Sequence, residues 1–97
     1  MKQDKYTKSA MGQECQVRIP GVCNRNPETV VLAHLNGAGM GTKHLSIHGA
    51  YACSDCHDVV DNRKWHDFLS YDDVKRYHLE GVIRTQQIMI KEGILKL

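Results

Sequence analysis

Apolar and polar positions along the chain predict two strands in its central part. Residues 29–35, Thr-Val-Val-Leu-Ala-His-Leu, are β-branched and apolar, which is typical of a buried strand. Residues 43–52 carry apolar side chains at alternate positions and predict a second strand. Between them, residues 36–43 form a glycine-rich loop, and its glycine spacing is not that of a phosphate-binding loop.

Two helices are predicted after the second strand. The first begins near Ser54, a suitable N-cap residue. Residues 70–73, Ser-Tyr-Asp-Asp, resemble a capping box that opens a long helix through about Glu92, along which apolar residues recur near the helical period. Gly93 follows as a C-terminal cap. The expected fold class is therefore α+β, with a long C-terminal helix packed over the strands.

The N-terminal part carries weaker signals. Residues 1–12 contain three lysines and almost nothing apolar, so we expect a flexible basic arm followed by one domain, residues 13–97. Val17 and Ile19 alternate with polar residues before the turn signal Pro20-Gly21. This pattern predicts a short strand and a turn.

The composition indicates that the hydrophobic core needs an additional stabilising cross-link. The 97 residues suit one domain, and with 6% aromatic residues its hydrophobic core should be thin. A net charge of +2 does not by itself indicate a nucleic-acid ligand. Nothing reads as a transmembrane helix or signal peptide, which predicts a cytoplasmic protein without a membrane partner. The oligomeric state, monomer or homodimer, stays open.

Four cysteines in a reducing compartment favour metal binding over disulfides. Cys53 and Cys56 have the C-x-x-C spacing of a zinc knuckle, and Cys15 and Cys23 form a second, wider pair. Together they predict a structural Zn²⁺ site of four thiolates, with unliganded buried thiols as the less favoured alternative. A redox role is a distant alternative, because a histidine and a second cysteine pair accompany the motif.

Three further residues are candidates for chemistry. His57 and Asp61 lie at i and i+4 and would share one face of the helix. They could bind Mg²⁺, Mn²⁺, Ni²⁺ or a second zinc ion. His34 ends the first predicted strand. From the residues alone, a core histidine satisfied by a hydrogen bond is the favoured interpretation there.

A histidine on one strand, a second strand, and Cys-x-x-Cys-His on a helix together resemble the HNH endonucleases, the ββα-metal superfamily. Over nearly its full length, the chain is especially similar to the YbcO family of lambdoid phages and prophages. The resemblance is carried by residues 15–23, 26–29, 32–34, 53–58 and 91–93. It implies a small zinc-stapled α+β domain with a ββα-metal (HNH) core.

The resemblance also implies a reaction, the hydrolysis of DNA phosphodiester bonds with one catalytic divalent cation. His34 corresponds to the general base that takes a proton from the attacking water. His57 corresponds to the helix histidine that binds the catalytic metal, and Asp61 falls where many members place a further ligand. An imidazole with a pKa near neutrality suits a general base.

The chain departs from the family pattern at two positions. Ala33 stands where many members carry a metal ligand, and Ser46 is the residue nearest to the position of the middle Asn. The metal is then expected on His57, Asp61 and waters, with His48 or Asp58 as substitute ligands. The remaining histidines, His44, His66 and His78, are expected to be surface or packing residues.

Basic residues near this site are candidates for phosphate contacts. They are Lys43, Arg63 and Lys64, and solvated charges at a helix end are an equally weighted alternative. The leading hypothesis is a metal-dependent HNH-type DNA endonuclease. The alternative is a non-catalytic zinc-stabilised module that binds nucleic acid or protein.

Overall fold

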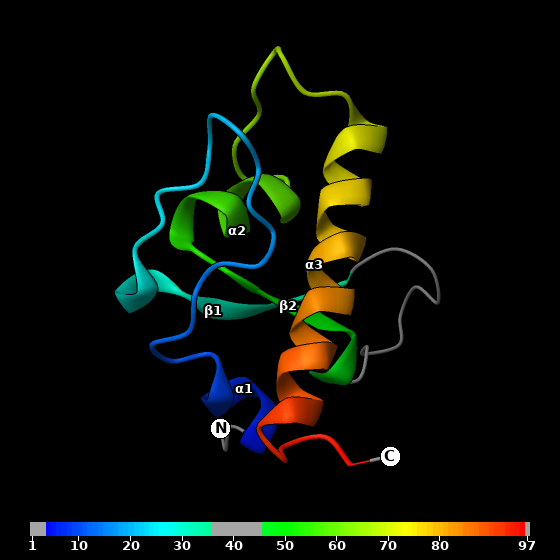
Figure 1. Ribbon diagram of the computed structural model, residues 1–97. Coiled ribbons are helices and arrows are strands. Elements are labelled where there is room, and N and C mark those ends of the chain that lie inside the picture. Colours follow the sequence, from blue (N-terminus) through cyan, green and yellow to red (C-terminus); the bar gives the residue numbers. More distant parts are fainter. Residues whose placement is uncertain (1–3, 36–45, 97) are drawn as a thin grey trace.

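The computed structural model describes residues 4–35 and 46–96 (Figure 1). Its regular elements are the helices α1 (Lys5–Ser9), α2 (Ser54–Val60) and α3 (Tyr71–Lys91), the strands β1 (Val31–His34) and β2 (Gly49–Ala52), and two single 3₁₀ turns, Pro27–Thr29 and Ser46–His48. The mixed α+β class expected from the sequence is confirmed. No helix in the described parts of the chain is long and apolar enough to cross a membrane.

The two strands form an antiparallel hairpin. Val31 pairs with Ala52 and His34 with Gly49, and within the described residues the sheet has these two strands. Both strands are shorter than expected. The residues before Val31 form a 3₁₀ turn, because Pro27 cannot donate to a ladder and Asn26 caps its first turn. The expected loop, residues 36–43, and the start of the second expected strand lie outside the described residues.

Helix α3 packs across β2, as Figure 1 shows. Its close approach depends on Gly81, where a Cβ atom would lie 3.1 Å from the Cα of Val17 and 3.2 Å from the Cβ of Ala50. Thr85 adds a polar contact, since its Oγ1 accepts a hydrogen bond of 2.9 Å from the backbone N–H of Tyr51. The Tyr51 carbonyl in turn accepts the N–H of Gln16 at 2.7 Å. The outer edge of β2 is therefore covered at Tyr51.

The ends of α3 confirm two predictions. Ser70 accepts a hydrogen bond from the Asp73 N–H at 3.0 Å, while the Asp73 carboxylate accepts the N–H of Ser70, which completes the capping box. Gly93 has φ +77° just beyond the last turn and donates its N–H to the Ile90 carbonyl. These short-range signals place both ends of the helix correctly.

The expected strand around Val17 and Ile19 does not form. Both side chains are fully buried, but they lie on a chain of turns in which Arg18 has φ +54°. A left-handed residue between them cannot continue a strand, and the alternating pattern reflects burial on a looped segment.

The N-terminal segment also differs from expectation. Within the predicted flexible arm, residues 5–9 form α1, whose first turn is capped by Asp4. The Ser9 hydroxyl lies 2.7 Å from the Tyr51 hydroxyl, and Ala10 is buried. A few contacts of small and polar side chains hold the segment, so hydropathy gave no sign of it. The domain boundary at residue 12 stays a prediction.

Candidate active site and metal centre

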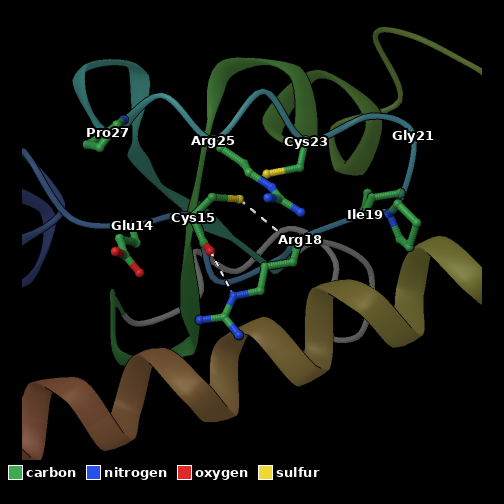
Figure 2. A pocket seen from close by; sticks show the side chains of 9 residues that line it. Glu14, Cys15, Arg18, Ile19, Gly21, Cys23, Arg25 and Pro27 are labelled. Carbon is green, nitrogen blue, oxygen red and sulfur yellow. Dashed lines mark hydrogen bonds between the residues drawn. The ribbon is translucent and has the colours of Figure 1, made fainter.

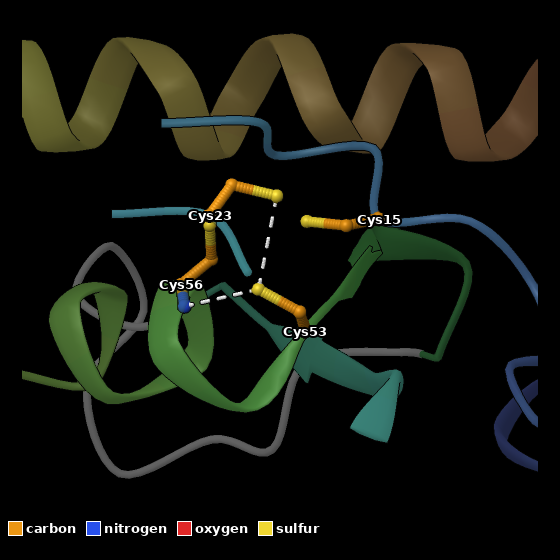
Figure 3. Close-up of side chains that lie close together, drawn as sticks. All are labelled: Cys15, Cys23, Cys53 and Cys56. Carbon is orange, nitrogen blue, oxygen red and sulfur yellow. Dashed lines mark hydrogen bonds between the residues drawn. The ribbon is translucent and has the colours of Figure 1, made fainter. Parts of the chain in front are cut away.

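The four cysteines meet at one point, although they come from two distant segments. Cys15 and Cys23 lie on the looped segment before β1, and Cys53 and Cys56 lie at the start of α2 (Figure 3). Their sulfur atoms all lie within 4.8 Å of one another. The predicted cluster is confirmed as a group of four thiols that could hold a metal ion.

The cluster fits the coordination geometry of zinc. Four sulfurs at the usual Zn–S distance of about 2.3 Å would be about 3.8 Å apart along each edge of a tetrahedron. The Sγ atoms of Cys23 and Cys53 are 3.8 Å apart. Without a cation, a shared hydrogen bond lowers the pKa of the Cys15 thiol and raises that of Cys56, and burial raises the pKa of Cys23. A Zn²⁺ ion would favour the thiolate form at all four.

Backbone geometry around the sulfurs is also suited to thiolates. The N–H of Arg18 points at Cys15 Sγ at 3.5 Å, and the N–H of Asn24 points at Cys53 Sγ at 3.4 Å. Arg18 and Arg25 both adopt positive φ, an unfavourable backbone conformation for residues other than glycine. The looped segment is thus bent so that its amides face the sulfur cluster.

Cys53 has a second task at the start of α2. Its side chain accepts the N–H of Cys56 at 3.4 Å and is the N-cap, so the helix begins one residue earlier than a cap at Ser54 would give. The expectation that Ser54 caps this helix is wrong. Ser54 is the first helical residue, and the need to turn Cys53 toward the cluster sets the boundary.

His34 ends β1 and is linked to a second polar residue, Ser46. Its Nε2 lies 3.4 Å from the Ser46 hydroxyl, which donates its hydrogen to the Asp4 carboxylate. A hydroxyl has one hydrogen, so Ser46 can only accept from His34. This arrangement puts the ring proton of neutral His34 on Nε2 and leaves the lone pair on Nδ1. The Ser46 hydrogen bond also lowers the pKa of Asp4.

His57 and Asp61 contact each other on α2, as the i, i+4 spacing predicts. His57 Nε2 is 3.1 Å from Asp61 Oδ2, and about a quarter of each side chain is exposed. Arg63 closes over the pair, with its Nη2 3.1 Å from His57 Nδ1 and 3.5 Å from Asp61 Oδ2. Arginine can only donate, so this contact requires the lone pair of His57 on Nδ1.

One of the histidines expected to be surface or packing residues, His78, is a packing residue next to β1. His78 on α3 is buried, and its Nε2 donates to the Ala33 carbonyl at 2.8 Å. Burial lowers the pKa of His78. The hydrogen bond places His78 beside the end of β1, one residue before His34.

The other candidates are spread around this region. Lys43 lies outside the described residues. Lys64 is exposed next to Arg63, whose Nε also binds the Asp58 carboxylate at 3.2 Å. His48 ends the turn before β2. Among the described residues, the cysteines are the group of three or more potential ligands that lie close enough together for one ion.

A pocket of about 580 Å³ opens beside the cysteine cluster (Figure 2). The looped segment forms it, and no pattern along the chain predicts it. Arg18, Arg25 and Glu14 are among the residues that line it. Arg18 is held by its own segment, since its Nε donates to the Cys15 carbonyl at 3.2 Å.

The fold and the cluster define a small α+β domain in which a long helix and a two-stranded hairpin surround a four-cysteine site suited to a metal ion. A family model described as "Putative nuclease YbcO" matches residues 4–94. The chain therefore belongs to the YbcO family.

Individual relatives agree with this assignment. Two proteins described as "Putative nuclease YbcO", one from Escherichia coli K12 and one from Enterobacteria phage 82, are each 51% identical over 92 residues, which is 92% of this chain and 94% of theirs. The solved structure of a "putative bacteriophage protein" from Escherichia coli K-12 is similar with a TM-score of 0.79 and 49% identity. The match covers 91% of this chain and 99% of that one.

Proposed function

We propose that this protein is a metal-dependent endonuclease of the HNH class that hydrolyses phosphodiester bonds in DNA. His34 acts as the general base, His57 and Asp61 bind one catalytic divalent cation, and the four cysteines hold a structural zinc ion. The nuclease names of its relatives support the reaction class. The order of β1, β2 and α2 supports the HNH assignment.

The observation that carries the proposal is the contact between β1 and α2, the two elements that hold the proposed base and the proposed metal ligands. Strand β1 ends at His34, and α2 carries His57 and is capped by Asp61, so the packing of these two elements against each other supports a shared site for the three residues. None of these three side chains is buried among apolar residues, since each is partly exposed. A hydrolytic site needs this combination of proximity and access to water.

His57 and Asp61 fit a hard divalent cation as two neighbouring ligands. Donor atoms at about 2.1 Å from an octahedral ion are about 3.0 Å apart when they are adjacent, and His57 Nε2 and Asp61 Oδ2 are 3.1 Å apart. Waters and a substrate phosphate would complete the shell. A bound cation would stabilise the negative charge that develops on the phosphate and the leaving oxygen.

The chain's own residues would supply the proton transfer. Ser46 and Asp4 orient the His34 ring and hold the ring proton on Nε2. The Nδ1 lone pair is then the one that accepts a proton from a water molecule. His78 fixes the Ala33 carbonyl, one residue before His34, and so holds the end of β1.

A nicking assay on supercoiled plasmid with Mg²⁺, Mn²⁺ or Ni²⁺ tests the proposal. Wild type should convert plasmid to the open circular form, and His34→Ala should abolish the conversion while its melting temperature stays close to that of wild type. Gln87→Ala, an exposed position on α3, is purified in parallel and should cut normally. Equal cutting by wild type and His34→Ala would point to a contaminating nuclease and refute the assignment.

One observation favours the alternative, a zinc-stabilised module that binds without catalysis. Arg63 donates to His57 Nδ1 and contacts Asp61. A metal ion on His57 Nε2 would require the ring proton on Nδ1, so Arg63 would first have to move away. If wild type binds DNA, binds no Mn²⁺ beyond its zinc and leaves plasmid intact, the non-catalytic function is the correct one.

A further inference from the structure

The loop between α2 and α3 exposes two large aromatic side chains that the fold does not use. Trp65 is 53% exposed and Phe68 is 60% exposed. They are the chain's one tryptophan and one phenylalanine. Single exposed apolar residues are common on protein surfaces, but two aromatic rings within four residues are an unusual use of so few.

This loop adjoins the pocket beside the cysteine cluster. The Phe68 ring lies over Gly21 on the pocket wall, where a Cβ atom would be 3.3 Å from Phe68 Cζ. Figure 1 shows that the loop before α3 and the looped segment before β1 reach the same end of the molecule. Phe68 thus connects the loop to the pocket.

Positive charge accompanies the rings. Arg18 and Arg25 line the pocket, and Lys64 directly precedes Trp65 in the loop. Glu14 on the pocket wall and Asp67 between the two rings in the loop carry the opposite charge. We call Arg18, Arg25, Lys64, Trp65 and Phe68 the aromatic–basic surface.

We propose that the aromatic–basic surface binds unpaired bases of single-stranded DNA beside the site of cleavage. The inference rests on the proposed function and specifies its substrate. Aromatic side chains bind nucleic acid by stacking on base faces, and lysine and arginine neutralise the backbone between them. In a duplex those faces are covered by neighbouring base pairs, so exposed rings next to a pocket lined by two arginines match a strand whose bases are open. Asp61, at the end of α2, starts the loop that carries both rings.

The single tryptophan gives a direct measurement. The zinc-loaded protein, residues 1–97, is titrated with a short oligothymidylate and with a duplex of equal length, in buffer without added Mg²⁺ or Mn²⁺ so that no strand is cut. Trp65 fluorescence should be quenched by the oligothymidylate, and anisotropy of a labelled strand should show tighter binding to it than to the duplex.

Substitutions separate stacking from charge. Trp65→Ala and Phe68→Ala should each weaken oligothymidylate binding by roughly 5- to 150-fold, the range measured for loss of one base–aromatic stack. Trp65→Phe and Phe68→Tyr keep a ring and should retain binding, which excludes misfolding as the cause. Arg25→Gln should reduce the slope of log affinity against log salt by about 0.7. Leu79→Ala, at an exposed apolar position on α3, should have no effect.

Two results would overturn the inference. One is equal affinity for both DNA forms with unchanged Trp65 fluorescence. The other is no DNA binding together with self-association that Trp65→Ala abolishes, which would assign the surface to a protein contact. The plasmid assay is read separately. Oligothymidylate binding without nicking would refute the proposed hydrolase activity and support the proposed binding surface. Nicking without a preference for single strands would refute only the proposed binding surface.

Discussion

Replacing Cys53 separates the stability supplied by a metal from that supplied by the side chain itself. The Cys53 sulfur belongs to the cysteine cluster and also caps α2 by accepting the Cys56 N–H. Serine at this position keeps a capping oxygen and removes a zinc ligand, whereas alanine removes both. The two variants therefore differ by the cap and share the loss of the metal.

The two contributions differ in size by an order of magnitude. Loss of an N-cap costs about 1 kcal/mol, which in a domain of this size lowers the melting temperature by roughly 4–8 °C. Structural zinc contributes on the order of 10–16 kcal/mol in small zinc-binding peptides, as much as the whole stability of about 5–15 kcal/mol of a typical domain. If zinc is bound, Cys53→Ser and Cys53→Ala should both lose cooperative unfolding.

Circular dichroism melts of wild type, Cys53→Ser and Cys53→Ala, each with and without a chelator, measure the effect. Emission spectroscopy gives the zinc content of the same samples. Wild type should carry one zinc ion per chain, and chelator should give it the same loss of structure as the variants. A Cys53→Ser protein that melts within a few degrees of wild type, together with chelator-resistant wild type, would refute the zinc assignment.

Two smaller changes test the residues around His34. The pKa of His78 in the folded protein lies below its ordinary value of 6.5. As the pH falls below about 6.5, the unfolded chain therefore takes up a proton that the folded protein does not. The free energy of unfolding should then fall by up to about 1.4 kcal/mol per pH unit. Urea unfolding between pH 7.5 and about 5.5 should show a smaller slope for His78→Gln than for wild type, and equal slopes would show that His78 titrates normally. Ser46→Ala should slow plasmid nicking, but by less than the roughly 10²- to 10⁴-fold that a general base contributes. Ser46→Thr keeps a hydroxyl and should retain activity. Unchanged rates in both variants would mean that Ser46 does not orient the base.

Short-range signals in the sequence were sufficient for both ends of α3 and for one half of the metal site. The capping box at Ser70, the cap at Gly93 and the spacing of Cys53 and Cys56 each depend on residues within one or two turns of one another. Local propensity and side-chain reach decide such features, whatever the rest of the chain does. The same holds for the contact of His57 with Asp61, one helical turn apart.

The features that the sequence did not predict depend on contacts between segments that are distant along the chain. Val17 and Ile19 alternate like strand residues, but the cysteines on either side turn that segment toward α2. Asp4 and Ser46 are 42 residues apart, and His78 reaches Ala33 across 45 residues. No periodicity encodes such pairs, because each depends on how α1 and α3 are packed against the hairpin. The roles of His34, His57 and Asp61 stay predictions for the nicking assay.

The covering of β2 at Tyr51 has a consequence for how the chain behaves at high concentration. A two-stranded sheet leaves open edges, and an open edge can template pairing with another copy and lead to aggregation. Here Thr85 and Gln16 occupy the N–H and the carbonyl of Tyr51. An incoming strand would have to displace helix α3 before it could add to β2. Helix α3 thus hinders strand addition at the edge of β2 while it supports the fold.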